Sequence, residues 1–386
     1  MKMPLFIYED LVEKNVKIIS SYTRRKIMAV VKSDAYGLSA KKMISLLKKA
    51  NIDFFVFEKY SEYLKCQNLL RDKRVLILES PSISLIQNTP NNVAFSINSI
   101  IDAINIKDIQ SKVTIHLRVD TGMNRQGVRN IEELEKILTM FKTNKNIFIE
   151  GLYTHFSSDV FESKYYEKQL ENFKKYQKIG HFSIIHANAT KSLNKELVGN
   201  YVRVGMALYG YHQPYLSLQR SVSLIETPCS VFKVSKKDKI GYNQIKVGNE
   251  VVGVLPIGYN DVNLDDITNI YQKGQKYALI GKNCMNHTHF LANDKINYLS
   301  WLSILPTNGI IIDSNDYNYN LNWYHILTSL KGMPKNYIRR RNYDVPKIFK
   351  YNGEKGLRTK FRKGSNQTFS FRTIQNGWRN FFCEIK

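Results

Sequence analysis

The run Ile27-Met28-Ala29-Val30-Val31-Lys32 places one lysine directly after five apolar residues, and Ser33-Asp34-Ala35-Tyr36-Gly37 follows it. A short apolar run rich in β-branched residues predicts a buried strand of a parallel sheet. Lys32 therefore stands where a strand ends and a loop begins. A desolvated amine at that place suits a nucleophile that attacks a carbonyl group, and a lysine that reaches for solvent is the alternative.

Seven further runs of this kind alternate with longer segments of helical periodicity. The strand runs are Phe54–Phe57, Val75–Leu78, Val93–Ile97, Val113–Val119, Ile147–Tyr153, Phe182–Ile185 and Tyr201–Val204. The helical segments include Ala40–Lys49, Tyr60–Leu70, Ile131–Phe141 and Lys164–Gln177. Eight strand-helix units in about 215 residues predict an α/β fold, a (β/α)8 barrel whose catalytic groups lie at the ends of strands.

Beyond Tyr211, turn residues instead of helices separate the apolar runs, which predicts a mainly β C-terminal domain. These runs are Cys229–Val234, Val251–Ile257, Tyr277–Ile280 and Ile310–Ile312. Pro214 and weak periodicity place the boundary within Gln213–Ser221. We therefore expect a barrel over residues 1–217, a β domain over 218–344 and an irregular basic tail over 345–386.

The composition is that of a folded chain, because 386 residues with 43% hydrophobic side chains suffice for the cores of two domains. Four cysteines, Cys66, Cys229, Cys284 and Cys383, lack the spacing of a zinc site or a disulfide framework. This predicts no metal and a reducing, cytoplasmic location. No uncharged run approaches the roughly 18 apolar residues of a membrane helix, so we expect no membrane partner.

The formal net charge of +24 raises the question of a nucleic-acid partner. Between Lys331 and Lys386 there are 15 Lys and Arg residues against three acidic residues, so half of the net charge lies there. The sequence contains no recognisable nucleic-acid-binding motif. Solvated basic faces are the favoured interpretation, and contact with a polyanion is the alternative.

A second candidate element lies at the eighth predicted strand, where Val202-Arg203-Val204 runs into Gly205 and Met206. Backbone N–H groups at such a turn can face an anion, and barrels bind phosphate after this strand. A simple chain reversal is the alternative for the turn alone. A lysine after the first strand and a phosphate cradle after the eighth together suggest pyridoxal phosphate as the cofactor.

The sequence resembles the alanine racemase family from about Lys32 to Asn286, with seven motifs in the family's order. They are Ala29–Gly37, Arg118–Gly127, Gly151–Phe156, Val202–Gly210, Gly241-Tyr242, Pro256–Asp261 and Gly281–Met285. The first is similar to the family's cofactor-lysine motif, the second to its DTGMxRxG segment and the fourth to its VRxGxxLYG segment.

The resemblance implies interconversion of L-alanine and D-alanine by two-base proton transfer through a pyridoxal phosphate aldimine, which supplies D-alanine for peptidoglycan. Lys32 would carry the cofactor and act as the base on one face of the substrate. Tyr242, contributed by the other subunit of a homodimer, would act on the opposite face. Two bases are needed because inversion removes a proton from one side and returns one to the other.

The resemblance also implies the remaining roles at the barrel mouth. Arg203 would face the pyridine nitrogen, and His155 would stack on the pyridine ring and hydrogen-bond Arg203. Arg125 would orient the cofactor or the substrate, and the backbone of Met285 would receive the substrate carboxylate. Core packing is the alternative for His155, Met285 and Tyr36. The remaining cofactor-binding candidates are Tyr36, Asn188, Thr190, Gly205 and Met206.

Four positions depart from the family pattern. Arg118 stands where many members have a carbamylated lysine, so we expect a chloride or an acidic side chain to offset its charge. Ala189 replaces a serine, and Thr190 is expected to supply the hydroxyl group. Asn286 replaces an aspartate, and Lys331 occupies the position of a tyrosine that contacts phosphate, which predicts reduced or altered turnover.

Other functions stay open on the sequence alone. The nearest are a racemase of another small amino acid such as serine and a weakly active pyridoxal-phosphate-binding relative. A decarboxylase of the related barrel family is disfavoured, because that group places an acidic residue at the pyridine nitrogen and this chain has Arg203. A non-catalytic pyridoxal phosphate carrier would lack the β domain and its Tyr242.

Overall fold

The computed structural model describes residues 5–157, 164–193, 196–211, 216–265, 267–272, 275–305 and 322–339, and the backbone of 361–363, 367–371 and 383–385. The chain divides into two compact units, Met1–Arg339 and Arg340–Lys386, and each is described by itself. All candidate site residues lie in the first unit.

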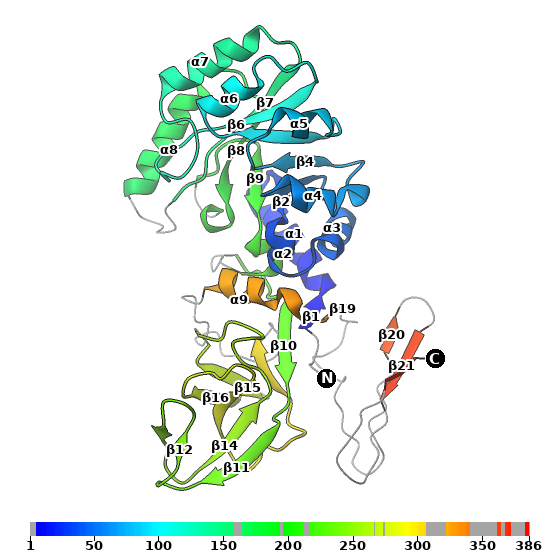
Figure 1. The fold of residues 1–386 in the computed structure, drawn as a ribbon, viewed down its shortest axis with the longest axis vertical. Coiled ribbons are helices and arrows are strands. Elements are labelled where there is room, and N and C mark those ends of the chain that lie inside the picture. Colours follow the sequence, from blue (N-terminus) through cyan, green and yellow to red (C-terminus); the bar gives the residue numbers. More distant parts are fainter. Residues whose placement is uncertain are drawn as a thin grey trace. The chain divides into compact units, whose positions relative to one another are not determined.

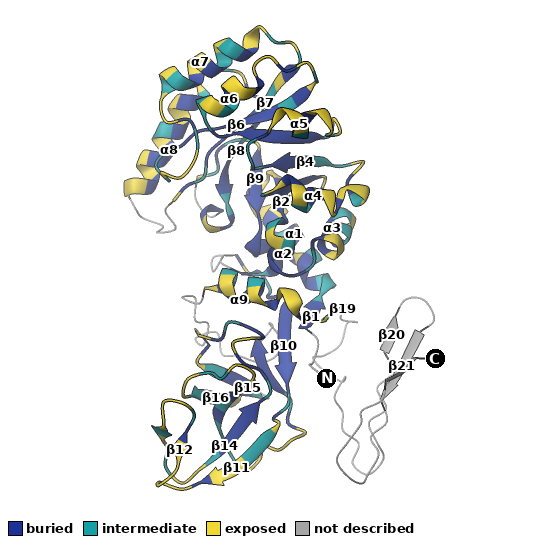
Figure 2. Cartoon of the chain, viewed as in Figure 1, coloured by how far each residue is buried: buried dark blue, intermediate teal, exposed yellow. Residues whose placement is uncertain are grey.

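Eight parallel strands close into a barrel in the first unit (Figure 1). They are β2 (Lys26–Val30), β3 (Phe54–Phe57), β4 (Arg74–Ile77), β5 (Val93–Ile97), β6 (Val113–Arg118), β7 (Ile147–Tyr153), β8 (Ile184–Ala189) and β9 (Tyr201–Val204). Each run expected from the sequence overlaps one of these strands, and the predicted barrel is confirmed. The strands are mostly buried, dark blue in Figure 2, because a barrel covers both faces of its sheet.

Helices lie between most of the barrel strands, and their exposed residues are yellow in Figure 2. The helices α3 (Ala40–Lys49) and α8 (Lys164–Gln177) have the expected bounds, and α7 (Ile131–Lys142) nearly so. The segment expected as one helix over Tyr60–Leu70 is instead α4 (Tyr60–Leu64) and a 3-10 turn (Gln67–Leu69). Cys66 N donates to Tyr63 O at 2.7 Å, and this tighter turn ends the α-helical pattern. The other helices are α1 (Glu9–Thr23), α2 (Lys32–Tyr36), α5 (Ile83–Gln87), α6 (Ile100–Ile106) and α9 (Trp323–Ser329).

A nine-stranded sheet forms the β region of the first unit, in the order β11-β14-β17-β16-β15-β18-β10-β1-β19. The predicted mainly β region is confirmed, and the expected run Ile310–Ile312 lies outside the described residues. The strands are β1 (Leu5–Tyr8), β10 (Val222–Glu226), β11 (Ser230–Val234), β14 (Glu250–Leu255), β15 (Asn269–Gln272), β16 (Gln275–Ile280), β17 (Thr288–Ala292), β18 (Leu302–Leu305) and β19 (Lys335–Ile338).

The strand β1 precedes the barrel in sequence but belongs to the sheet of the β region. It pairs antiparallel with β10 and parallel with β19. The β region therefore takes its strands from both sides of the barrel in the sequence. A separate hairpin, β12 (Lys239–Ile240) and β13 (Ile245–Lys246), completes this region among the described residues.

The described backbone of the second unit consists of three short strands, β20 (Phe361–Lys363), β21 (Gln367–Phe371) and β22 (Cys383–Ile385). They pair antiparallel in one sheet, whereas the sequence predicts an irregular tail. In the part of the chain that the structure describes, no helix combines the length and apolar character needed to span a membrane.

Candidate active site

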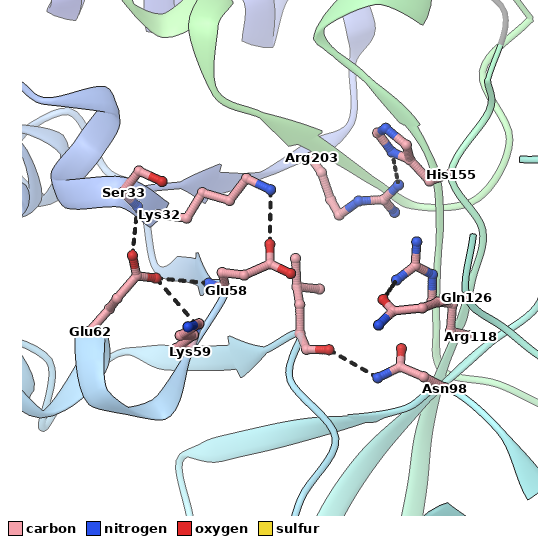
Figure 3. A network of polar contacts seen from close by, with 11 residues as sticks. Lys32, Ser33, Glu58, Lys59, Glu62, Asn98, Arg118, Gln126, His155 and Arg203 are labelled. Atoms are coloured by element: carbon pink, nitrogen blue, oxygen red, sulfur yellow. Dashed lines mark hydrogen bonds and ion pairs between the residues drawn. The ribbon is translucent and has the colours of Figure 1, made fainter. Parts of the chain in front are cut away.

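The carboxyl ends of the barrel strands bring together charged or titratable side chains from distant parts of the sequence (Figure 3). Lys32 and Glu58 follow β2 and β3, Arg118 ends β6, His155 follows β7 and Arg203 lies in β9. Successive parallel strands of a barrel end on the same side, so these residues share one mouth. The sequence placed Lys32, His155 and Arg203 here and missed Glu58.

Lys32 is presented by a left-handed turn. The four residues Ser33 to Tyr36 have φ angles between 53° and 57°, although none of them is glycine. Each such residue costs roughly 1–2 kcal/mol relative to the right-handed conformation. Part of this cost is offset by a hydrogen bond from Ser33 N to Glu62 Oε1 at 2.7 Å. A strained turn that its surroundings hold in place is typical of a functional site.

Arg203 is buried, and a histidine ring and backbone carbonyls fix its guanidinium. Its Nη1 donates to His186 Nδ1 at 2.6 Å and to the His186 carbonyl at 2.7 Å. Its Nη2 donates to the carbonyls of Thr154 at 2.6 Å and Ala187 at 3.1 Å. Burial, and then the charge of Arg118, lowers the pKa of Arg203 to about 10. The guanidinium therefore stays charged near neutral pH and cannot turn away from the mouth without losing these bonds.

His155 is held as a neutral imidazole beside Arg203. Burial lowers the pKa of His155 to about 3, and the charges of Arg203, Arg125, Arg118 and Lys32 act in the same direction. Arg203 Nη2 lies 3.4 Å from His155 Nδ1, which fits a neutral ring that accepts at this nitrogen. The mouth therefore holds an uncharged aromatic ring among cations.

Tyr36 lies against Gly205. A Cβ on Gly205 would lie 2.1 Å from the Tyr36 hydroxyl oxygen, so a larger residue would displace that ring. Burial raises the pKa of Tyr36, and its ring centroid lies 5.8 Å from that of Tyr324 in α9. Gly205 N donates to Thr190 Oγ1 at 3.3 Å, and Met206 follows in the chain. The structure thus brings together four of the residues expected around a phosphate, with the N–H of Gly205 already directed at Thr190.

Asn188 is buried, and its side chain bonds to the protein itself. Its Nδ2 donates to the carbonyls of Ser192 at 3.0 Å and Glu196 at 3.2 Å, and its Oδ1 accepts from Val198 N at 2.9 Å. These bonds fix the segment that carries Thr190. A direct contact of Asn188 with a cofactor stays a prediction.

The guanidinium of Arg118 has an uncharged hydrogen-bond partner, Gln126. Its Nη1 donates to Gln126 Oε1 at 2.7 Å, and its guanidinium lies 5.8 Å from the centroid of the Tyr153 ring. Its Nε is buried, without a hydrogen-bond partner among the described residues. In the part of the chain described, no acidic side chain forms an ion pair with Arg118, and Arg125 is exposed. Among the described residues, an amide and an aromatic face therefore lie where an acidic side chain was one of the two expected partners, and a chloride at Arg118 stays a prediction.

Tyr242 and Met285 lie in the β region and are 77% and 54% exposed. Tyr242 follows Gly241 in the loop between β12 and β13, and Lys282 N donates to Asn243 Oδ1 at 2.8 Å. This bond ties the Tyr242 loop to the segment that carries Met285. Within the described residues, no hydrogen bond or ion pair joins Tyr242 or Met285 to Lys32.

A buried polar chain leads from the mouth through the barrel core. Arg203 bonds to His186, and His186 Nε2 lies 2.9 Å from His116 Nδ1. His116 Nε2 lies 3.0 Å from Glu150 Oε2, and Glu150 forms an ion pair with Arg74. Arg203 is therefore held, through His186, by groups inside the barrel that the cofactor would not touch.

Several of these groups escaped prediction from the sequence. Glu58 had a usable signal, because it directly follows an apolar strand run, as Lys32 does. His116 and Glu150 are polar residues within the runs Val113–Val119 and Ile147–Tyr153, which is a weaker signal. Gln126 gave no signal, because an exposed amide in a loop has many possible partners.

Comparison with known proteins shows which family and which relatives this chain is similar to. The family described as alanine racemase, N-terminal domain, matches residues 7–213. The alanine racemase of Staphylococcus carnosus is 27% identical over 306 residues, which cover 73% of this chain and 80% of that protein. The alanine racemase of Borreliella burgdorferi strain ZS7 is 28% identical over 304 residues, 72% of this chain and 80% of that protein.

Solved structures share the fold. The biosynthetic alanine racemase of Pseudomonas aeruginosa superposes with a TM-score of 0.78 at 20% identity, covering 88% of this chain and 100% of that one. A histidine racemase of Leuconostoc mesenteroides superposes with a TM-score of 0.73 at 18% identity, covering 87% of this chain and 97% of that one. At these identities the likeness concerns the fold alone.

Proposed function

This chain belongs to the alanine racemase family, and from that premise we propose that it interconverts L-alanine and D-alanine with pyridoxal 5'-phosphate. The observation that carries the proposal is the barrel mouth, where a lysine, a fixed buried guanidinium and a neutral imidazole come together. The D-alanine produced would supply peptidoglycan synthesis. We place the protein in the cytoplasm, supported by the free state of Cys66, Cys229 and Cys284.

The residues of the mouth fit the cofactor. Lys32 supplies a primary amine for an aldehyde, and the lack of a Cβ on Gly205 lets the Tyr36 hydroxyl lie directly against the turn. Arg203 would hold the pyridine nitrogen, and the neutral ring of His155 would stack on the pyridine. The phosphate would lie near Tyr36, Thr190 and the turn at Gly205 and Met206.

When bound, pyridoxal phosphate supplies an electron sink that makes the α-hydrogen of an amino acid acidic. Lys32 Nζ would then take or return the proton on one face, and the Tyr242 hydroxyl on the other. Arg203 keeps its own proton, with a pKa of about 10, so a pyridine nitrogen facing it would stay unprotonated. With the cofactor bound, this arrangement would limit the spread of charge into the ring and so would disfavour side reactions.

A homodimer would complete the site. Tyr242 and Met285 are exposed in the subunit, as are Tyr259 (54%) and Phe232 (40%) of the same region. Large exposed apolar groups in one region are typical of a protein interface. Arg125 would orient the substrate from the barrel side, and the Met285 backbone would receive its carboxylate from the partner side.

Cofactor and reaction can be tested on one preparation. Purified protein is mixed with pyridoxal phosphate, reduced with borohydride and digested, and we expect the modified lysine to be Lys32. D-alanine formed from L-alanine is followed with D-amino-acid oxidase. Lys32→Ala should lose both signals, whereas Lys26→Ala, at the opposite end of β2, should keep both. An adduct on another lysine contradicts the cofactor assignment.

A racemase of another amino acid is the second candidate. Of the departures from the family pattern, Arg118 lies within one of the seven motifs and Asn286 directly follows another, whereas Ala189 and Lys331 lie outside them. The same assay with L-serine and L-histidine decides between the substrates. A higher kcat/KM for either of these than for L-alanine contradicts the proposed substrate.

A further inference from the structure

Glu58 and Lys32 occupy equivalent places on neighbouring strands. The strands β2 and β3 are parallel, with Val30 opposite Val56, so Lys32 and Glu58 each lie two residues beyond a matched pair. Lys32 Nζ lies 2.8 Å from Glu58 Oε2 (Figure 3). The register of the two strands therefore places the Glu58 carboxylate beside the Lys32 amine, which is proposed to carry the cofactor.

The backbone on both sides of this ion pair is fixed by one further carboxylate. Glu62 Oε1 accepts from Ser33 N at 2.7 Å, next to Lys32, and Glu62 Oε2 accepts from Glu58 N at 3.1 Å. Glu79 N also donates to the Glu58 carbonyl at 2.9 Å. The backbone next to both partners of the ion pair is therefore attached to the start of the same helix, α4.

The mouth contains several cations, and the Glu58 carboxylate forms an ion pair with one of them. Lys32, Arg118, Arg125 and Arg203 are the cations that act on His155. Arg118 is bonded to a neutral amide, and Arg203 to carbonyls and a histidine. Among the described residues, the ion pair that joins a carboxylate to one of these cations is Lys32–Glu58.

A second carboxylate near the mouth, Asp120, serves the loop instead. Its oxygens accept from the backbone N–H groups of Gly122, Asn124 and Arg125. Asp120 therefore fixes the path of the loop after β6. This leaves Glu58 as the carboxylate placed to act on Lys32.

We propose that Glu58 is a positioning residue for Lys32, which orients Lys32 Nζ and stabilises the proton on that nitrogen before and after pyridoxal phosphate is attached. The inference rests on the proposed function, because it takes Lys32 as the point of attachment. A carboxylate within hydrogen-bond distance favours the protonated form of a nitrogen. Lys32 would accordingly receive a substrate proton more readily, since the resulting ammonium group meets a counter-charge.

The first experiment uses protein freed of cofactor and an acylating reagent for amines. The rate of labelling at Lys32 is measured by mass spectrometry, with exposed Lys26 of the same strand as internal reference. Glu58→Gln removes the carboxylate that holds the ammonium hydrogens, and we expect labelling at Lys32 to be several-fold faster. Glu79→Gln is the matched control, because Glu79 bonds to the backbone of Tyr60 and not to a lysine.

The second experiment uses the holoenzyme and follows its visible absorbance against pH, which reports the proton on the lysine-cofactor linkage. In Glu58→Gln we expect the midpoint to fall, because the counter-charge of the protonated linkage is lost. The side chains of Lys32 and Glu58 are 37% and 43% exposed, so solvent screens part of this effect. Glu58→Asp, which keeps the charge, should lie nearer to the wild-type midpoint.

The outcomes separate this inference from the proposed function. If Glu58→Gln matches Glu79→Gln in the labelling rate or in the midpoint, the inference is overturned. Wild-type protein that attaches no cofactor to Lys32 contradicts the proposed function, and the labelling rates still decide whether Glu58 governs Lys32. A misfolded Glu58→Gln is recognised by its circular dichroism, and Glu58→Asp against Glu79→Gln then gives the comparison.

Discussion

Single residues set the charge balance of this site, and Arg118 is the clearest case. The guanidinium is buried and depends on Gln126 Oε1 at 2.7 Å. Hydrogen bonds to a charged group stabilise by about 1.5–3 kcal/mol, and exposure of Gln126 favours the lower end. We therefore expect Gln126→Ala to lower the free energy of unfolding by about 1.5 kcal/mol in urea titrations. Gln110→Ala, which removes only a local bond to the Asp108 carbonyl, should change it far less.

Arg118 also predicts how the racemase activity responds to bicarbonate. A lysine at this position can form a carbamate with dissolved carbon dioxide, but an arginine at neutral pH has no free amine to do so. We expect the racemase rate to be the same with and without bicarbonate at constant pH and ionic strength. A rate that rises with bicarbonate would mean that an amine elsewhere in the protein forms the activating carbamate.

At the scale of one element, the turn after β2 stores backbone strain. Ser33 is exposed and has a φ of 53°, a conformation that glycine adopts without cost. Ser33→Gly should therefore raise the free energy of unfolding by about 1 kcal/mol. It should also lower kcat, because a more mobile backbone presents Lys32 less well. Ser45→Gly in the regular helix α3 is the control and should lower stability by a similar amount.

The histidines of neighbouring strands predict a pH dependence of stability. Burial lowers the pKa values of His116, His186 and His155, the last to about 3. In the unfolded chain they return to about 6.5, so below that pH the unfolded state binds more protons than the folded state. The free energy of unfolding should fall as the pH is lowered from about 6.5 toward the folded pKa values. Each histidine contributes up to about 1.4 kcal/mol per pH unit to this fall.

Urea unfolding at several pH values measures this slope. His155→Gln should reduce the slope, because one group that gains a proton on unfolding is lost. His325→Gln, on the exposed side of α9, is the control and should leave the slope unchanged. Equal slopes in all three proteins would exclude His155 as a buried neutral group.

At the scale of the whole molecule, the exposed Tyr242 predicts complementation between inactive subunits. Lys32→Ala and Tyr242→Phe proteins should each be inactive as homodimers. When they are unfolded together and refolded in equal amounts, half of the dimers are mixed, and each mixed dimer regains one intact site. We expect about one quarter of the wild-type activity. No recovery above the separate proteins would place Tyr242 in the site of its own subunit.

How far the sequence predicts this molecule depends on how local the signal is. The eight barrel strands follow from apolar runs such as Phe54–Phe57, which are buried whatever their partners. The pairing of Lys32 with Glu58 depends on the register between two strands, which no single run contains. The left-handed turn after Lys32 contradicts local preference, because only surrounding bonds maintain it. The partner strands of Leu5–Tyr8 are so distant in the sequence that its four residues do not indicate which strands they pair with.

That strand also has a consequence for the order in which a newly synthesised chain acquires its structure. The ribosome releases Leu5–Tyr8 before any barrel strand, but its neighbours arrive only with Val222–Glu226 and Lys335–Ile338. The barrel can close while this apolar strand still has two open edges, and open edges attract strands of other nascent chains. The interval between the first and the last of these segments is therefore when the growing polypeptide most needs protection from aggregation.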